Sequence, residues 1–407
     1  GAVTDQDQYF FTGSVIRAGG IYHFYYCGHN QTFQQQGKPA QAIMHATSKD
    51  LLNWQKQPED TLYAHEELFE PHDWRDPYVF WNADAGEYWM LVTARLKVGL
   101  PLRKGCLVLF TSPDLAAWTY REVFWAPNLY INHECSELFR MGDYWYLLYS
   151  TYSERFLTHY RMSRSIRGPW VAPFNDTFDG RAFYAAKTVA EGDRRFILGW
   201  LPSRQGERDG GRWEWGGHLV AHEIMQERDG TLSVKMPESL DTVFRRREPF
   251  DLSLNMGARS VDGDHLAFEA EDSFAFVLGQ KLPQRCRISV TLRFSRSTKG
   301  CGLILRASDD LSAAYFVRIE PERDRLVLDR SPRDGDLPYA VELERPIRLE
   351  DGARHRLTVV LDTTICLVYL DDRIAVSTRF YDHREGRLGM FCKEGTAEFF
   401  GMEIHGE

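Results

Sequence analysis

A short run of aromatic and apolar residues recurs four times in the N-terminal part of the chain. Its copies are Tyr22-His-Phe-Tyr-Tyr26, Tyr88-Trp-Met-Leu-Val92, Tyr144-Trp-Tyr-Leu-Leu148 and Arg195-Phe-Ile-Leu-Gly199. A second element follows three of them, as Ser48-Lys-Asp-Leu-Leu-Asn-Trp54, Ser112-Pro-Asp-Leu-Ala-Ala-Trp118 and the degenerate Ser163-Arg-Ser-Ile-Arg-Gly-Pro-Trp170. The period is about 50–65 residues, so each repeat accommodates one supersecondary unit.

Each repeat reads as strand, turn, strand, strand, turn, strand. Four short antiparallel strands at this period are typical of a β-propeller blade, because one such sheet cannot bury both faces alone and stacks on its neighbours. The sequence predicts four blades, ending near Glu238. A β-sandwich with accidental self-similarity is the alternative, and the repeated Asp-Leu-x-x-Trp turn favours the propeller.

After about residue 250 the repeat stops and strictly alternating strands follow, such as Arg287–Phe294 and His355–Leu361. These runs, with turn signals at Asp371-Asp372 and Arg333–Asp336, predict two packed antiparallel sheets. The chain is therefore expected to be all-β, with a propeller at 1–243 and a β-sandwich at 251–407. Residues 244–250 form a polar linker in this prediction.

Charge and composition limit the classes of partner. A net charge of −9 argues against nucleic acid or an anionic membrane as the main partner, and an aromatic content of 14% suits sugar-binding platforms. The seven cysteines are an odd number with no C-x-x-C pair, which indicates reduced thiols, a cytoplasmic location and no zinc site. The N-terminus does not resemble a signal peptide, and no phosphate-binding glycine motif occurs, so neither a metal nor a nucleotide cofactor is expected.

Two acids begin apolar strands at corresponding places in the repeats. A propeller directs the first strand of each blade along one central funnel, and three such starts stand out: Phe11-Thr-Gly-Ser14, Trp74-Arg-Asp-Pro77 and His133-Glu-Cys-Ser136. Asp76 and Glu134 would then face a shared site, as the two carboxyl groups of a glycosidase do. The competing interpretation is structural: these acids could bind backbone amides in turns, and Arg75 could pair with Asp76.

The order of these three motifs resembles that of glycoside hydrolase family 32, which contains invertases, levanases and inulinases. The resemblance extends over nearly the whole chain, and it implies a five-bladed propeller followed by a β-sandwich. It implies that Asp76 stabilises the transition state through fructose hydroxyls, with Arg75 as its neighbouring ligand and as the cation that keeps it ionised. By the same resemblance Glu134 is the general acid/base and Cys135 lies beside it, although Ser136 stands where the family usually has proline. Phe11 and Thr12 would line the fructose pocket.

One family motif does not occur in this sequence. The resemblance places the nucleophilic Asp on the first blade, in a Trp-Met-Asn-Asp-Pro-Asn-Gly-like segment upstream of the motif matched by Phe11–Ser14. The sequence therefore predicts blades two to five, with the first blade and its nucleophile on a missing segment or a separate chain. Asp5 and Asp7 lie near the start, where chains usually fray, so they are weak replacements. A true four-bladed propeller is the alternative.

Two further segments could reach the funnel. Trp215, in Trp213-Glu-Trp-Gly-Gly-His218, is a candidate for sugar contact or an inter-blade wedge. Asp179 and Arg181 open the fourth blade, where a turn role is favoured.

The leading hypothesis is a retaining β-fructofuranosidase that acts on sucrose, fructo-oligosaccharides, levan or inulin. The alternatives are a carbohydrate-binding module that has lost its chemistry and an inverting arabinanase-like propeller glycosidase.

Overall fold

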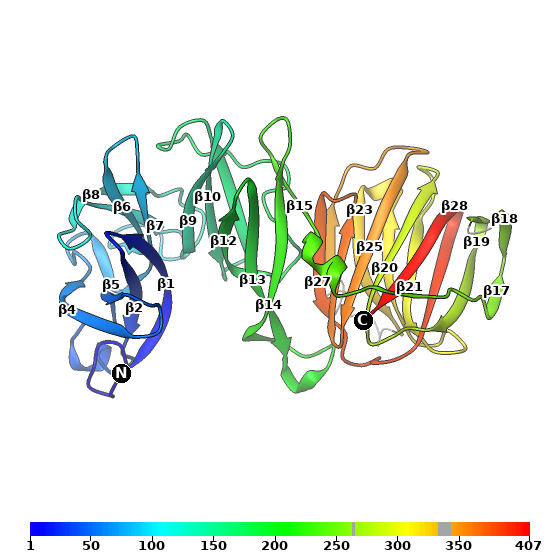
Figure 1. Ribbon diagram of the computed structural model, residues 1–407, viewed down its shortest axis with the longest axis horizontal. Coiled ribbons are helices and arrows are strands. Elements are labelled where there is room, and N and C mark those ends of the chain that lie inside the picture. Colours follow the sequence, from blue (N-terminus) through cyan, green and yellow to red (C-terminus); the bar gives the residue numbers. More distant parts are fainter. Residues whose placement is uncertain (263–264, 333–342) are drawn as a thin grey trace. The chain divides into compact units, whose positions relative to one another are not determined.

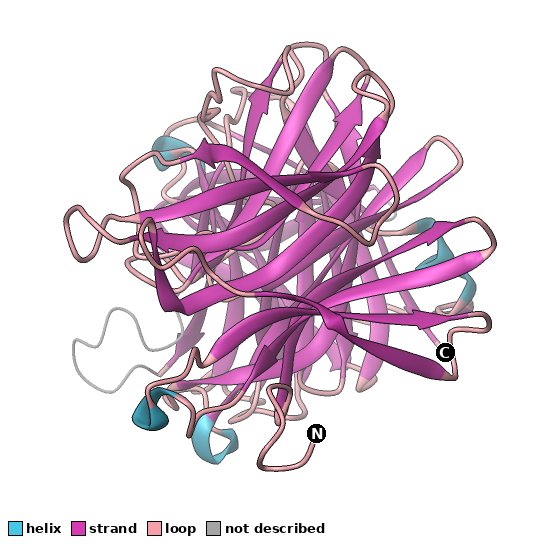
Figure 2. Cartoon of the chain, turned by 90° about the vertical axis from the view of Figure 1, so that its left-hand side faces the viewer, coloured by secondary structure: helices cyan, strands magenta, loops and turns pink. Residues whose placement is uncertain are grey.

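The computed structural model describes residues 1–262, 265–332 and 343–407, and nearly all of their regular structure is β-strand (Figure 2). The 3-10 helices of these residues are η1 (Gln34–Gln36), η2 (Gln205–Glu207), η3 (Glu238–Thr242) and η4 (Pro321–Arg323). In the described ranges, no helix is long and apolar enough to cross a membrane. The turn expected at Arg333–Asp336 lies outside the described residues.

The chain packs into two compact units. The first contains Gly1–Asp176 and Tyr184–Lys187, and the second contains Thr177–Phe183 and Thr188–Glu407. The domain boundary at the 244–250 segment stays a prediction. Within that segment, residues Arg246–Glu248 form a short strand, β16, that pairs with the last strand of the sandwich.

Three antiparallel sheets of the first unit are propeller blades (Figure 1). The first is formed by β1 (Tyr9–Ala18), β2 (Ile21–His29), β3 (Gln41–Ser48) and β4 (Trp54–Leu62). The second is formed by β5 (Phe69–Asn82), β6 (Glu87–Leu96), β7 (Gly105–Ser112) and β8 (Thr119–Trp125). The third is formed by β9 (Glu134–Met141), β10 (Tyr144–Thr151) and β11 (Leu157–Ser163).

A fourth sheet completes the repeat, with β12 (Tyr184–Glu191), β13 (Arg194–Arg204), β14 (Trp213–Gln226) and β15 (Leu232–Lys235). The predicted fourfold repeat is confirmed, since each recurring aromatic run lies in the second strand of its sheet. The third sheet differs from the prediction: its expected fourth strand is reduced to a single bridge between Met162 and Val171. Pro169 and Pro173 flank that bridge, and neither can donate a backbone hydrogen bond to a ladder.

The Asp-Leu-x-x-Trp element forms the turn between the third and fourth strands of a blade. The carboxylate of Asp50 accepts hydrogen bonds from the amides of Leu52 and Asn53, at 2.9 and 2.8 Å. Asp114 accepts from the amides two and three residues further on in the same way, at 3.0 and 3.1 Å. The repeated sequence thus repeats a capped turn.

The second blade packs on a neighbour through each face. Met90 and Val92 point to the face that shares a core with Tyr25 and Ile43 of the first blade. The intervening Leu91 points to the other face, where it joins a cluster with the third blade that includes Leu138 and Leu147. Alternation along the strand therefore supplies both inter-blade cores.

The β-sandwich of the second unit is one connected antiparallel network of strands β16–β28. Its strands after β16 are β17 (Leu254–Met256), β18 (Ala258–Asp262), β19 (His265–Lys281), β20 (Arg285–Phe294), β21 (Gly300–Ala307), β22 (Ala314–Glu320), β23 (Arg325–Ser331), β24 (Leu343–Pro346), β25 (Arg354–Asp362), β26 (Ile365–Leu370), β27 (Ile374–Arg379) and β28 (Arg387–Gly406). The long strand β28 pairs with β16, β19, β20 and β21, and so links the layers around a buried apolar core.

The inter-blade core gives a direct test of the packing. Leu147 is fully buried between the second and third blades, whereas Leu52 is 83% exposed in a turn of the first. We expect Leu147→Ala to lower the free energy of unfolding by about 3 kcal/mol, because it removes buried methyl groups and leaves a cavity. Leu52→Ala is the matched control and should change it by less than about 0.5 kcal/mol. Urea titration followed by tryptophan fluorescence measures both, and equal midpoints for the two variants would contradict this packing.

Candidate active site

The candidate residues lie on the innermost strands of successive blades. Asp76 is on β5, Glu134 is the first residue of β9, and Tyr184 is the first residue of β12. The strand register breaks near Asp76, between Arg75 and Tyr78, and again beside Glu134. Such bulges bend a strand and redirect its side chains, so they aim these residues at a shared point.

The backbone is left-handed at three non-glycine residues in this region. Asp76 has φ 54°, Cys135 has φ 53° and Ala185 has φ 53°. Side chains disfavour this conformation, and such residues persist only where the surrounding structure holds them. Their clustering on three inner strands of one unit marks this region as a functional site.

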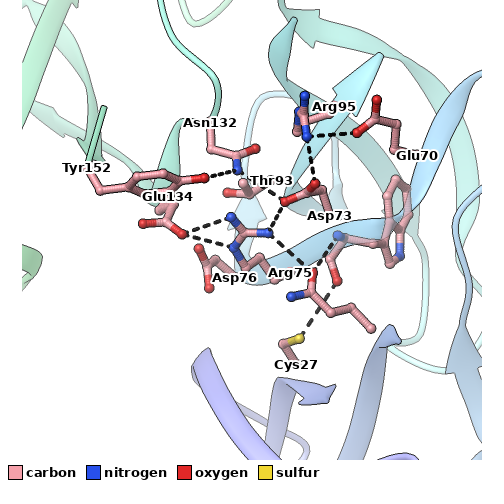
Figure 3. Close-up of polar contacts among 12 residues, drawn as sticks. Cys27, Glu70, Asp73, Arg75, Asp76, Thr93, Arg95, Asn132, Glu134 and Tyr152 are labelled. Carbon is pink, nitrogen blue, oxygen red and sulfur yellow. Dashed lines mark hydrogen bonds and ion pairs between the residues drawn. The ribbon is translucent and has the colours of Figure 1, made fainter. Parts of the chain in front are cut away.

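The two carboxyl groups lie side by side in this site (Figure 3). The backbone amide of Cys135, the residue after Glu134, donates a 2.8 Å hydrogen bond to Oδ2 of Asp76. Both acids are buried, with Asp76 2% and Glu134 8% exposed. The structure therefore brings together the pair that the sequence singled out.

Arg75 binds Glu134 rather than Asp76, so the predicted pairing of Arg75 with Asp76 is wrong. Its Nε and Nη2 donate to Oε1 of Glu134 at 3.0 and 2.9 Å, and its Nη1 donates to Asp73 at 2.8 Å (Figure 3). Adjacent strand residues point to opposite sides, which directs the Arg75 side chain away from the carboxyl that follows it.

The expectation that Arg75 keeps Asp76 ionised is also wrong. Burial, together with the nearby Glu134 carboxyl, raises the pKa of Asp76 to about 6. Arg75, the Cys135 amide and Lys187 oppose this rise without cancelling it. The site therefore retains a proton close to neutral pH.

Tyr184 completes the surroundings of Glu134. Its hydroxyl donates to Oε2 of Glu134 at 2.5 Å, so each oxygen of this carboxyl has a donor. Burial and the Glu134 charge raise the pKa of Tyr184 far above its ordinary value, which keeps the phenol protonated as a donor.

The other predicted residues of the first unit lie around this pair. The Thr12 hydroxyl is 3.4 Å from the sulfur of Cys135, which places β1 against β9. Phe11 is 41% exposed, and its ring stacks on that of His29 at 4.7 Å. Thr12 and Cys135 therefore touch the carboxyl site, while Phe11 presents a partly open aromatic surface.

Three predicted acids and one tryptophan have other surroundings. Trp215 is on β14 in the second unit, 68% exposed and edge-on to Trp200, and its contact with sugar stays a prediction. Asp179 is buried in the second unit, where it binds His222 at 2.9 Å and the amide of Ser377 at 2.7 Å. These contacts fit the structural role that the sequence favoured.

Asp5 and Asp7 belong to an ordered segment, so the expected fraying of the chain start is wrong. Asp7 is 1% exposed and accepts a 3.0 Å hydrogen bond from the Tyr26 hydroxyl, and Lys56 forms an ion pair with it at 2.5 Å. The carbonyl oxygen of Asp5 accepts a hydrogen bond from Asn30. Burial opposes the charge of Asp7, but Lys56 and Tyr26 hold its pKa below the ordinary value, as expected of a structural ion pair.

Sequence reasoning missed the residues that hold Arg75 and Glu134. Asp73, Gln41 and Tyr184 make these contacts. Asp73 could have been found, because it lies two residues before Arg75 and so on the same side of β5. Tyr184 begins its inner strand as Glu134 does, which is the signal that identified the acids. No cluster of three or more His, Cys, Asp or Glu side chains suited to a metal ion occurs in the part of the chain that the structure describes.

The raised pKa of Asp76 predicts a pH-dependent cost to stability. The folded pKa lies above that of the unfolded chain, so the contribution of this group is most favourable at low pH and is lost as the pH rises through about 6. We expect Asp76→Asn to gain about 2–3 kcal/mol of unfolding free energy, relative to the wild type, between pH 4 and pH 7.5. Urea titrations at both pH values measure this difference. Asp84→Asn, at an exposed turn of the same blade, controls for loss of one charge, and an equal gain there would contradict the prediction.

The comparisons agree with this geometry. The profile for the "Glycosyl hydrolases family 32 N-terminal domain" matches residues 2–231, and that for "Glycosyl hydrolases family 32 C terminal" matches residues 264–406. Sucrose-6-phosphate hydrolase of Escherichia coli is 24% identical over 420 residues, which cover 95% of this chain and 77% of that protein. Raffinose invertase of Escherichia coli is 24% identical over 416 residues, with 95% and 78% covered.

Solved structures of the same fold extend over almost the whole chain. Sucrose-6-phosphate hydrolase from Lactobacillus gasseri has a TM-score of 0.74 at 17% identity, covering 99% of this chain and 79% of that one. Fructan 1-exohydrolase IIa from Cichorium intybus also has a TM-score of 0.74, at 14% identity, with 99% and 85% covered. On the family profiles, which match both parts of the sequence, this chain belongs to glycosyl hydrolase family 32.

Proposed function

We propose that this chain is the main part of a retaining β-fructofuranosidase, which releases terminal β-D-fructofuranosyl residues from sucrose or a fructan. The observation that carries the proposal is the buried pair of Asp76 and Glu134, with the Cys135 amide between them. Relatives named sucrose-6-phosphate hydrolase and raffinose invertase support a small sugar substrate. A Bombyx mori β-fructofuranosidase variant of this fold was solved in complex with sucrose.

Each acid has a separate role in the proposed mechanism. Glu134, protonated, donates its proton to the glycosidic oxygen as the bond to the anomeric carbon breaks, and later accepts a proton from the attacking water. Asp76 binds fructose hydroxyls and stabilises the positive charge that develops on the ring. A third carboxylate attacks the anomeric carbon and forms the covalent fructosyl intermediate, which water then hydrolyses.

We propose that this third carboxylate comes from a further β-sheet, outside the sequence studied, that packs on the open face of the first blade. In the second blade, Met90 and Val92 face the preceding blade. By the repeat, Phe24 and Tyr26 hold the equivalent positions in the first blade. A sheet packed over them would bring its innermost strand beside β1, where Thr12 touches Cys135.

The face in question has the character of an unfilled inter-blade contact. Its buried apolar cluster has only three residues, Tyr26, Met44 and Ala46, whereas thirteen form the core between the first and second blades. Phe10 is 59% and Val15 48% exposed on the same sheet. A cavity of about 350 Å³ opens there, lined by Phe10, Val15, Phe24, Tyr26, Ala46, Trp54 and Lys56. Exposed apolar patches of this kind mark contact surfaces.

We also propose a cytoplasmic location. All seven cysteines are buried, and none of them forms a disulfide in the described chain. Such thiols are typical of a reducing compartment.

The proposed mechanism makes Glu134→Gln a decisive variant. In a protein that contains the additional sheet, in cis or as a separate chain, we expect this change to lower kcat/KM for sucrose and inulin at least about 100-fold, because the amide cannot donate the required proton. Glu122→Gln, at a half-exposed position on β8, is the matched control and should retain activity. Proton NMR of the first-formed fructose should show the β anomer, and the α anomer would favour the inverting alternative.

The origin of the nucleophile has its own test. Residues 1–407 alone should bind fructans without hydrolysing them, since no fructosyl-enzyme can form. Addition of the missing sheet should restore hydrolysis. Full activity from residues 1–407 alone would contradict the external nucleophile, and binding without hydrolysis in the complete protein would favour a carbohydrate-binding module.

A further inference from the structure

Charged side chains of alternating sign extend outward from Glu134 in the first unit (Figure 3). Arg75 contacts both Glu134, at 2.9 Å, and Asp73, at 2.8 Å. Arg95 on β6 contacts Asp73 at 3.0 Å and Glu70 at 2.9 Å. Lys104 ends the series with an ion pair to Glu70.

Asp73 is the branch point of this series. Its Oδ1 accepts hydrogen bonds from Arg75 and from Asn132, at 2.8 and 3.2 Å, and its Oδ2 accepts from Arg95 at 3.0 Å. Burial opposes its charge, but Arg75, Arg95 and Asn132 hold the pKa of Asp73 below its ordinary value. Asp73 is therefore a fixed negative charge on the side of Arg75 away from Glu134.

We propose that Asp73 is a positioning residue for the acid of this site: it shares the Arg75 guanidinium with Glu134, so that Arg75 orients the Glu134 carboxyl without locking it in the ionised form. This inference rests on the proposed role of Glu134 as general acid. Asp73 touches Glu134 only through Arg75.

The electrostatic argument follows from the requirements of the acid. A guanidinium that donates two hydrogen bonds to a carboxyl favours its charged form, whereas a general acid must hold a proton at the working pH. A second carboxylate on the same guanidinium weakens that preference, because it offsets part of the positive charge. Arg75 is 6% exposed, so water screens this balance only weakly.

Other charged and titratable groups face the same centre, and they define the background. Asp76 lies beside Glu134 on the other side, Tyr184 donates to it, and Lys187 lowers the pKa of Asp76. Tyr152 accepts a hydrogen bond from Asn132, and His29 lies within the influence of Arg75. None of these groups is altered by a change confined to Asp73.

Asp73 also tethers the chain that leads into Glu134. Asn132 lies two residues before Glu134, and its side-chain amide joins Asp73 of β5 to the Tyr152 hydroxyl beyond β10. One carboxylate thus fixes both the arginine that orients the acid and the segment that carries the acid.

The test is a titration of Glu134 in residues 1–407, which needs no hydrolysis. Carbon-13 NMR of protein labelled at the glutamate side-chain carboxyl reports each midpoint, and the Glu134 signal is the one missing from Glu134→Gln. We expect Asp73→Asn to lower the Glu134 midpoint by about 0.5–1 pH unit, because a negative charge that compensates Arg75 has been removed. Asp84→Asn, on an exposed turn of the same blade, is the matched control and should shift it by less than about 0.1 unit.

A second variant changes the sign of the effect. Arg95→Gln removes a positive charge that compensates Asp73, so the Glu134 midpoint should rise. A purely structural role for Asp73 predicts no opposite shifts, because both variants would only loosen the site. An unchanged midpoint in folded Asp73→Asn, or shifts of the same sign in the two variants, would overturn the proposal. If Asp73→Asn does not fold, failure of Arg95→Gln to raise the midpoint overturns it instead.

Failure of the proposed function has a different signature. Opposite midpoint shifts, found together with an active Glu134→Gln enzyme, would retain the charge sharing and reject Glu134 as the acid. In an active complete protein, Asp73→Asn should move the alkaline limb of kcat/KM to lower pH by the same 0.5–1 unit or so. An alkaline limb that stays in place despite a shifted midpoint would separate Glu134 from that limb.

Discussion

Two carboxyl groups buried in one site repel each other when both are ionised, and the centre of the first unit is arranged around that repulsion. Asp76 receives the Cys135 amide, while Glu134 receives the guanidinium of Arg75 and the hydroxyl of Tyr184. These donors come from three different inner strands. The site therefore exists only when blades stack in register, which makes blade packing a condition for the chemistry as well as for stability.

The backbone bears part of the cost of this arrangement. Asp76, Cys135 and Ala185 adopt left-handed φ values although each has a side chain, at roughly 1–3 kcal/mol apiece. The inter-blade cores beside β5 and β9 contain many fully buried apolar side chains, such as Leu91 and Leu138, and these can hold the strained strands in place. The position of the acids on strands rather than loops has the same consequence, because their separation is fixed by hydrogen-bonded sheets.

The fold and the identity of the two acids could be predicted from the sequence because both depend on local pattern. The repeat placed the second strand of every blade, and the start of an apolar inner strand located Asp76 and Glu134. The partners of those acids could not be predicted in the same way. Whether Arg75 turns to Asp76 or to Glu134 depends on a bulge between Arg75 and Tyr78, which sequence alone does not reveal. Tyr184 reaches Glu134 from a strand that begins 50 residues later, so no local pattern links them.

The strand β1 connects the open face of the first blade with the acid site. Its Phe10 and Val15 line the exposed apolar cavity, while Thr12, between them in sequence, contacts Cys135. The register of β1 with β2 breaks between Phe10 and Gly13, within this same segment. A sheet packed over Phe10 and Val15 would restrict that irregular segment and, through Thr12, the turn that carries Glu134. Occupation of the open face and precision at the carboxyl pair are thus mechanically coupled, even though the residues that perform the two tasks point to different sides of one strand.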